Sequence, residues 1–177
     1  MQLSRPVIAR AALDILNSYG LADVSMRRVA GSLGVAPGAL YWHIDSKQAL
    51  IAAMADEIIA PVLASTHPGP KEFCSALRDA LLSHTDGADV VSTAASQADS
   101  PVFPALLNGI RAAFPHDPPE SAAAGLLYLT LGAANLHQAG TRLREITAGD
   151  GPVPYGSAEH VDAAVDLLLA GLDADQS

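Results

Sequence analysis

The chain has 177 residues, half of them hydrophobic and only 16% charged, which excludes a disordered protein and suits a globular one with a sizeable core. Its net charge of −9 is unevenly divided: residues 1–50 carry +2 and the remainder carries −11, so only the N-terminal part has a charge that suits DNA. The single cysteine, Cys74, excludes an intramolecular disulfide, and we expect it to be a small core residue in a reducing compartment. Asp14 interrupts the first apolar stretch, so we expect no signal peptide and a cytoplasmic protein.

The N-terminal residues predict three helices. Apolar spacing predicts the first over residues 4–19, where Tyr19 completes the apolar stripe. Ser25 is a good N-cap for the second helix, and Gly34 suits the left-handed conformation that ends it. Pro37 fits the first turn of the third, where its missing N–H costs nothing. The second and third helices thus form a helix-turn-helix, whose second helix can lie in a DNA major groove.

The remaining residues predict further helices separated by Pro- and Gly-rich breaks, with no strand pattern. We expect these helices over residues 46 to the low sixties, 71–84, 88–97, 102–114, 120–144 and 157–172, with a loop over 148–156. The fold class is therefore all-α. We expect a three-helix helix-turn-helix head over residues 1–48, followed by a helical ligand-binding and dimerisation domain over 49–177.

Two apolar seams in the last two helices predict a homodimer. Small residues and leucines alternate at spacings of 4 and 3 in both helices, which permits close helix packing. Doubled by a two-fold axis, they would form a four-helix bundle. The same helices could instead fill a monomeric core. Residues 121–141 carry no charged side chain, and we expect them in an oligomer core, not in a membrane. The seam residues are Gly125, Leu129, Gly132, Leu136 and Ala139, then Val161, Val165, Leu168 and Leu172.

Residues 7–50 resemble the DNA-binding domain of TetR-family regulators without gaps. The motif that carries the resemblance is Leu40-Tyr41-Trp42-His43, followed by a helix capped at Ser46. The resemblance implies a palindromic double-stranded DNA operator. It also implies DNA contacts from ten residues, namely Ser25, Arg27, Arg28, Pro37, Gly38, Ala39, Tyr41, Trp42, His43 and Lys47.

These ten residues have different expected roles. An arginine at the position of Arg27 reads guanine in similar tetracycline repressors, and a guanidinium can bond guanine O6 and N7 together, although a phosphate contact is the alternative. Arg28, Tyr41, His43 and Lys47 are expected at phosphates or the plain surface. For Ser25 the alternative is capping alone, and for Trp42 it is a core position.

The third helix is unusual because Pro37, Gly38 and Ala39 offer no side-chain hydrogen bond to a base. Base reading is therefore expected from Arg27, from the aromatic pair Tyr41 and Trp42, and from close backbone approach at Gly38. Leu40 and Ile44 are expected in the core.

The second half resembles tetracycline repressors more weakly, at Asp86-Gly87-Ala88 and Thr130-Leu131-Gly132-Ala133. The positions that hold drug-bound magnesium in those repressors fall on Val91 and Leu136, which have no oxygen ligand for a hard cation. We therefore expect no metal, no other cofactor and no tetracycline–magnesium ligand.

The ligand expected instead is a small apolar molecule in an apolar pocket. For each wall residue, a plain core position is the alternative to a ligand contact. The candidate wall comprises Leu63, Phe73, Leu77, Val91, Phe103, Leu107 and Leu127, with Asn135 or His137 as polar handles.

The resulting prediction is a ligand-responsive transcriptional regulator, a repressor released from its operator by a small apolar molecule. The alternative is a regulator-like protein that acts as a ligand trap or partner without specific DNA reading. No nucleophile-elbow, zinc-protease, phosphate-loop or dinucleotide motif occurs, so we expect no enzymatic activity.

Overall fold

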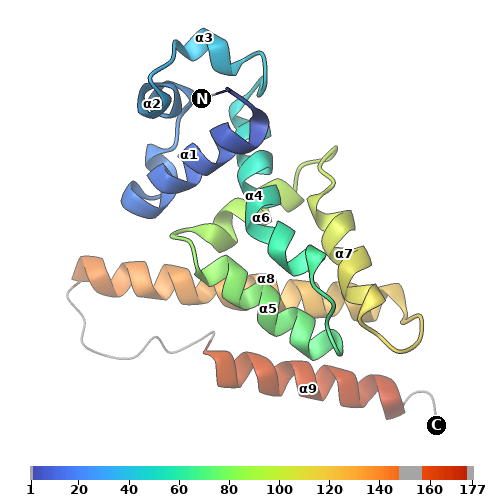
Figure 1. The fold of residues 1–177 in the computed structure, drawn as a ribbon. Coiled ribbons are helices and arrows are strands. Elements are labelled where there is room, and N and C mark those ends of the chain that lie inside the picture. The colour runs from blue at the N-terminus through green and yellow to red at the C-terminus, as the bar shows by residue number, and fades with distance from the viewer. Residues whose placement is uncertain (1, 148–156, 175–177) are drawn as a thin grey trace. The chain divides into compact units, whose positions relative to one another are not determined.

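The computed structural model describes residues 2–147 and 157–174 as a set of helices joined by short loops (Figure 1). A 3-10 turn, η1 (Leu21–Asp23), follows the first helix. No strand occurs in the described part of the chain, so the predicted all-α class is confirmed. The loop expected over residues 148–156 lies outside the described residues. The helices are α1 (Arg5–Tyr19), α2 (Met26–Leu33), α3 (Pro37–Leu40), α4 (Lys47–Ala64), α5 (Pro70–Leu82), α6 (Gly87–Ala95), α7 (Val102–Ala112), α8 (Glu120–Thr147) and α9 (Ala158–Ala174).

The contacts divide the chain into two compact units. The first unit contains residues 1–61 and 80–103, and the second contains residues 62–79 and 104–177. The predicted division after residue 48 stays a prediction, since contacts group residues 80–103 with the N-terminal helices without testing which part binds DNA or ligand.

In the first unit, α1 packs on α2 and α2 on α3, as in a helix-turn-helix head. The predicted end signals are confirmed. The Ser25 hydroxyl accepts a hydrogen bond from the Arg28 amide at 3.2 Å, and Gly34 ends α2 at φ 68°. Pro37 lies in the first turn of α3. The prediction for Tyr19 is wrong, because its side chain is 61% exposed and does not join the buried stripe of α1.

Several helices end earlier than the apolar spacing predicts, since that spacing continues past the last bonded turn. Helix α5 ends at Leu82, α6 at Ala95 and α7 at Ala112, whereas α8 continues to Thr147. Asp86, in the turn between α5 and α6, adopts φ 55°, a left-handed conformation that helices exclude.

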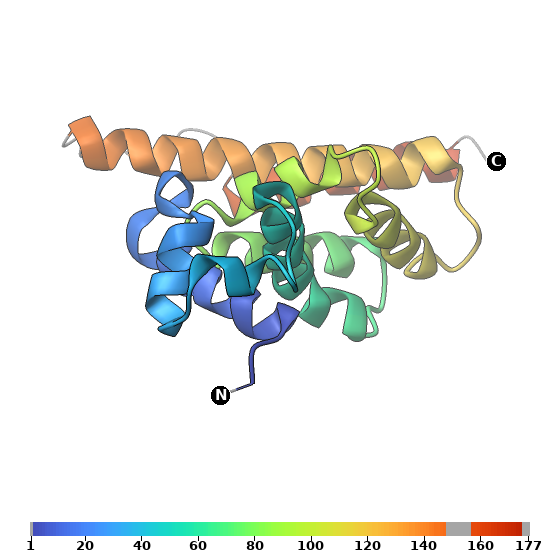
Figure 2. The same cartoon turned by 90° about the horizontal axis from the view of Figure 1, so that it is seen from above.

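In the second unit, α8 is one long uninterrupted helix, and α9 packs along it (Figures 1 and 2). Arg78 of α5 is buried and donates to Asp162 of α9 at 2.9 Å. Lys71 pairs with Asp166 one turn further along α9, at 2.6 Å. Cys74 is buried, as predicted, and burial raises the pKa of its thiol above the ordinary value of 9.0. No helix in the described ranges is both long and apolar enough to cross a bilayer.

Candidate nucleic-acid interface

The turn after α3 presents two aromatic side chains to solvent. Trp42 is 89% exposed and Tyr41 is 52% exposed. The structure therefore excludes the alternative that Trp42 is a core residue. The exposed indole and phenol rings offer aromatic and apolar contact area beside the helix-turn-helix.

Two buried neighbours set the direction of these side chains. Leu40 and Ile44 are almost fully buried, as predicted. The amides of His43 and Ile44 both donate to the Leu40 carbonyl, at 2.9 and 2.8 Å. This tight turn continues α3 beyond its last α-helical residue. Because its two ends are anchored in the core, Tyr41, Trp42 and His43 lie on the outside.

The first turn of α3 has little side-chain chemistry of its own. Pro37 and Gly38 are exposed, and Ala39 is half-buried. A Cβ added at Gly38 would meet no heavy atom within 4 Å, and its φ lies outside the left-handed region. Neither packing nor backbone conformation therefore requires glycine at this position. The glycine leaves the backbone open to a partner that approaches closely.

The cations of the head fall into two groups. Arg5 and Arg10 of α1 pair with Asp56 and Glu57 of α4, each at 3.4 Å. Arg28 pairs with the carboxylate of Asp23, and its guanidinium lies 4.0 Å from the centre of the Tyr19 ring. These three side chains are engaged within the protein.

Arg27 and Lys47 form the second group. Within the described residues, neither side chain makes a hydrogen bond or an ion pair, and both residues are exposed. Lys47 opens α4, where the Ser46 hydroxyl accepts from the Ala49 amide at 3.0 Å. The head therefore offers two free cations, one at the start of α2 and one at the start of α4.

The structure thus places all ten predicted DNA-contact residues on the helix-turn-helix and the start of α4, and most are exposed. Ser25 caps α2, and its expected phosphate contact stays a prediction. The partners of Arg28 were not predicted. Only the five-residue step to Asp23 could have indicated that ion pair, and the ring of Tyr19 was assigned to the core.

The expected ligand wall divides between the two units. Val91 and Phe103 belong to the first unit, and the other candidates belong to the second. Phe73, Leu77 and Leu127 are fully buried in the second unit, and Leu107 is half-buried.

Part of this wall is tightly packed. A Cβ at Gly109 would come within 3.0 Å of both Phe73 and Leu63, so α7 approaches these side chains as closely as glycine allows. Of the polar handles, the Asn135 amide donates to the Leu131 carbonyl of its own helix at 2.9 Å, and His137 is half-buried. These contacts are typical of a core, and the ligand role of these residues stays a prediction.

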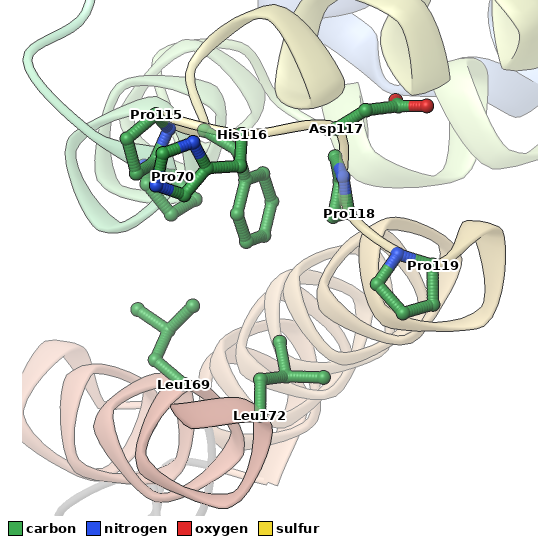
Figure 3. Close-up of a pocket in the computed structure, with 9 residues that line it drawn as sticks. Pro70, Pro115, His116, Asp117, Pro118, Pro119, Leu169 and Leu172 are labelled. Carbon is green, nitrogen blue, oxygen red and sulfur yellow. The ribbon is translucent and has the colours of Figure 1, made fainter. Parts of the chain in front are cut away.

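A pocket that was not predicted opens elsewhere in the second unit (Figure 3). It has a volume of about 210 Å³. Figure 3 shows Leu169 and Leu172 of α9 facing the proline-rich loop between α7 and α8. The Arg111 guanidinium donates to Asp117 of this loop at 2.6 Å. The lining residues are Pro70, Phe114, Pro115, His116, Asp117, Pro118, Pro119, Leu169 and Leu172.

Val91 and Leu136, the positions to which the resemblance assigns the magnesium site of tetracycline repressors, carry apolar side chains. Val91 is fully buried and Leu136 is 60% exposed. No group of three histidine, cysteine or acidic side chains that could hold a metal occurs among the described residues.

Comparison with known proteins agrees with a helix-turn-helix head in the N-terminal residues. Residues 8–54 match the model of the tetR family of bacterial regulatory proteins. The class C tetracycline repressor of Escherichia coli is 36% identical over 100 residues, which is 50% of this chain and 44% of that repressor. The matched segment therefore spans less than half the length of this curated relative.

Solved structures match over nearly the full length. BioQ of Mycobacterium smegmatis is 34% identical with a TM-score of 0.84, covering 98% of this chain and 99% of that one. A structure of BioQ with its natural double-stranded DNA operator is 36% identical with a TM-score of 0.74, covering 97% and 98%. A possible TetR-family transcriptional regulator from Streptomyces coelicolor A3(2) is 30% identical with a TM-score of 0.73, covering 97% and 99%.

Proposed function

Because this chain belongs to the TetR family of bacterial regulatory proteins, we propose that it is a DNA-binding transcriptional regulator, a repressor released from its operator by a small apolar molecule. The observation that carries the proposal is a set of exposed groups on the helix-turn-helix and the start of α4. They are Trp42, Tyr41, the open backbone at Gly38 and the cations Arg27 and Lys47, which make no ion pair in the described residues.

Each part of this surface suits one component of duplex DNA. Lys47 suits a phosphate, whose contacts supply affinity without sequence preference. Arg27 suits a guanine edge in the major groove. The aromatic pair and the bare backbone of α3 suit apolar and shape contacts. That BioQ was solved with a double-stranded operator supports the same class of partner.

We propose that the protein is a homodimer. Its two-fold symmetry would place two identical heads on DNA, so the proposed operator is palindromic. Support comes from α8, where the predicted seam lies outside the protomer core and Leu136 is 60% exposed. A shallow groove of about 340 Å³ follows this seam and is lined by Tyr128, Leu129, Gly132, Ala133, Leu136, His160 and Val161. The predicted seam of α9 differs from that of α8, because Val161 and Val165 are buried within their own protomer. Of these three α9 residues, only Leu168, at 45% exposure, is open to a partner protomer.

The proposed effector is a small apolar molecule with no magnesium requirement. Cavities of about 150 Å³ with apolar walls hold a benzene-sized ring, so the 210 Å³ pocket of Figure 3 is large enough for one. The predicted wall around Leu107 is the competing location. A tetracycline titrated with and without magnesium should show no tight, metal-dependent binding.

DNA binding is tested by selecting bound duplexes from a random pool. A regulator enriches one palindrome, whereas the alternative, a ligand trap without specific DNA reading, enriches none. The effector site is tested next, by finding apolar compounds that release the selected operator. Leu172→Trp would fill the pocket of Figure 3, and Leu107→Trp would fill the space inside the predicted wall. If the compound fails to release only one of these variants from the operator, the effector binds at the site that this variant fills.

A further inference from the structure

The turn between α5 and α6 holds the loop that leads into the helix-turn-helix. All of these residues belong to the first compact unit. The carboxylate of Asp86 accepts a hydrogen bond from the Leu21 amide at 2.8 Å. One turn earlier in α1, the Asn17 side-chain oxygen accepts from the Thr85 amide at 3.2 Å, and the Asn17 carbonyl accepts from the Thr85 hydroxyl at 3.3 Å. Two adjacent residues of this turn, Thr85 and Asp86, thus hydrogen-bond to the last turn of α1 and to the loop that follows it.

The conformation of Asp86 is unusual and serves this contact. Asp86 directly precedes α6, a position where an aspartate normally caps its own helix. Here its side chain makes no cap hydrogen bond, and its backbone adopts φ 55°. Such a conformation costs free energy in a residue with a Cβ and persists where the surroundings require it. The side chain is buried, with 5% exposure, and is directed to the Leu21 amide instead.

Two glycines allow the close approach. A Cβ at Gly87 would lie 2.3 Å from the Leu81 carbonyl oxygen, so the turn tolerates no side chain there. Gly20 adopts φ 81°, and a Cβ there would lie 3.2 Å from the Asp86 carboxylate. The contact therefore depends on the two glycines as well as on the hydrogen bonds of Asp86 and Thr85, and not on a single surface hydrogen bond.

The held loop is short and leads directly to α2, the first helix of the helix-turn-helix. Leu21 begins η1, Val24 is fully buried, and Ser25 caps α2. Only a few residues separate the Leu21 amide from Arg27. We infer that Asn17 and Asp86 are positioning residues, which fix the direction of α2 and α3 relative to α6 and thereby the direction in which Arg27 and Trp42 meet DNA. The DNA part of this inference rests on the proposed function.

The test separates the side-chain contact from backbone strain. Asp86→Gly removes the acceptor but adopts a positive φ without strain, so any loss in this variant comes from the missing hydrogen bond. Asp86→Asn keeps an acceptor oxygen and tolerates the left-handed conformation. Asp89→Asn removes a carboxylate from the same helix without touching the loop and is the matched control for charge.

The first readout needs no DNA. Hydrogen exchange of the Leu21 amide should accelerate about 10- to 100-fold in Asp86→Gly, as expected for a lost hydrogen bond to a charged group. Exchange should stay close to that of the wild-type protein in Asp86→Asn and Asp89→Asn. Residual dipolar couplings should show a changed or averaged orientation of α2 relative to α6 in Asp86→Gly alone.

The second readout uses the selected operator with one base pair added to or removed from the centre. Asp86→Gly should discriminate less between these spacings than the wild-type protein, a change that a purely stabilising contact would not produce. Unchanged Leu21 exchange in Asp86→Gly, or unchanged couplings despite faster exchange, overturns the inference. Should the wild-type protein bind no duplex, the proposed function fails, while exchange and couplings still decide the positioning role.

Discussion

Gly38→Ala should make the protein more stable and a weaker DNA binder at the same time. Gly38 lies in the first turn of α3, has no atom within 4 Å of the new methyl group and needs no positive φ. Replacing a helical glycine by alanine in such a position stabilises a protein by roughly 0.5–1 kcal/mol, because the unfolded chain loses conformational freedom. For a chain of this size, that corresponds to a rise in Tm of about 1–4 °C.

The same methyl group should prevent the backbone of α3 from reaching the duplex. We expect affinity for the selected operator to fall at least tenfold, or about 1.4 kcal/mol. The assays are thermal unfolding by circular dichroism and fluorescence anisotropy with labelled operator. Gly31→Ala is the matched control, since Gly31 is also helical, exposed and free of neighbours within 4 Å, but lies in α2. A Gly38→Ala protein that gains stability and binds the operator as tightly as the wild type would refute close backbone approach at this position.

Three further outcomes follow from the same structure. Arg27→Ala should cost about 1–3 kcal/mol of binding free energy and relax the sequence preference at one base position in each half-site. Lys47→Ala should instead weaken binding to all sequences alike and lower the slope of log affinity against log salt by about one. Equal weakening of every operator variant by Arg27→Ala would make Arg27 a phosphate contact. Leu168→Glu should dissociate the dimer in ultracentrifugation by placing a charge in the bundle, and a monomeric wild-type protein at micromolar concentration would contradict the seam. Burial raises the pKa of the Cys74 thiol, so the folded protein should react with a thiol reagent far more slowly than the unfolded one. The neutral thiol contributes stability that is complete below the ordinary pKa of 9.0 and is lost as the pH rises through the raised value. Unfolding curves of the wild-type protein should show this loss, and those of Cys74→Ala should not.

The head could be predicted well because its signals are local. A cap at Ser25, a left-handed end at Gly34 and a proline opening α3 act within a single turn, so their residue types identify the conformation directly. The burial of Leu40 and Ile44 follows from helical spacing in the same way.

Contacts between distant residues could not be predicted. Apolar spacing places Tyr19 on the buried stripe of α1, but its ring lies under Arg28, which a neighbouring carboxylate also holds. Asp86 looks like an ordinary helix cap by position, and only the folded chain brings it to the Leu21 amide. The pocket of Figure 3 depends on α9 meeting a loop more than fifty residues earlier, which no local pattern reports.

The central claim is that the surface formed by the start of α2, by α3 and by the following turn binds duplex DNA. Trp42 is the single tryptophan of the chain and is 89% exposed on that surface, so its fluorescence reports on the claim without a label. The free protein should show the emission of a solvated indole that iodide quenches readily. Saturating amounts of the selected operator should change that emission and protect Trp42 from iodide, while a scrambled duplex at the same concentration should not. Emission and iodide quenching that remain those of the free protein at saturating operator would contradict the account.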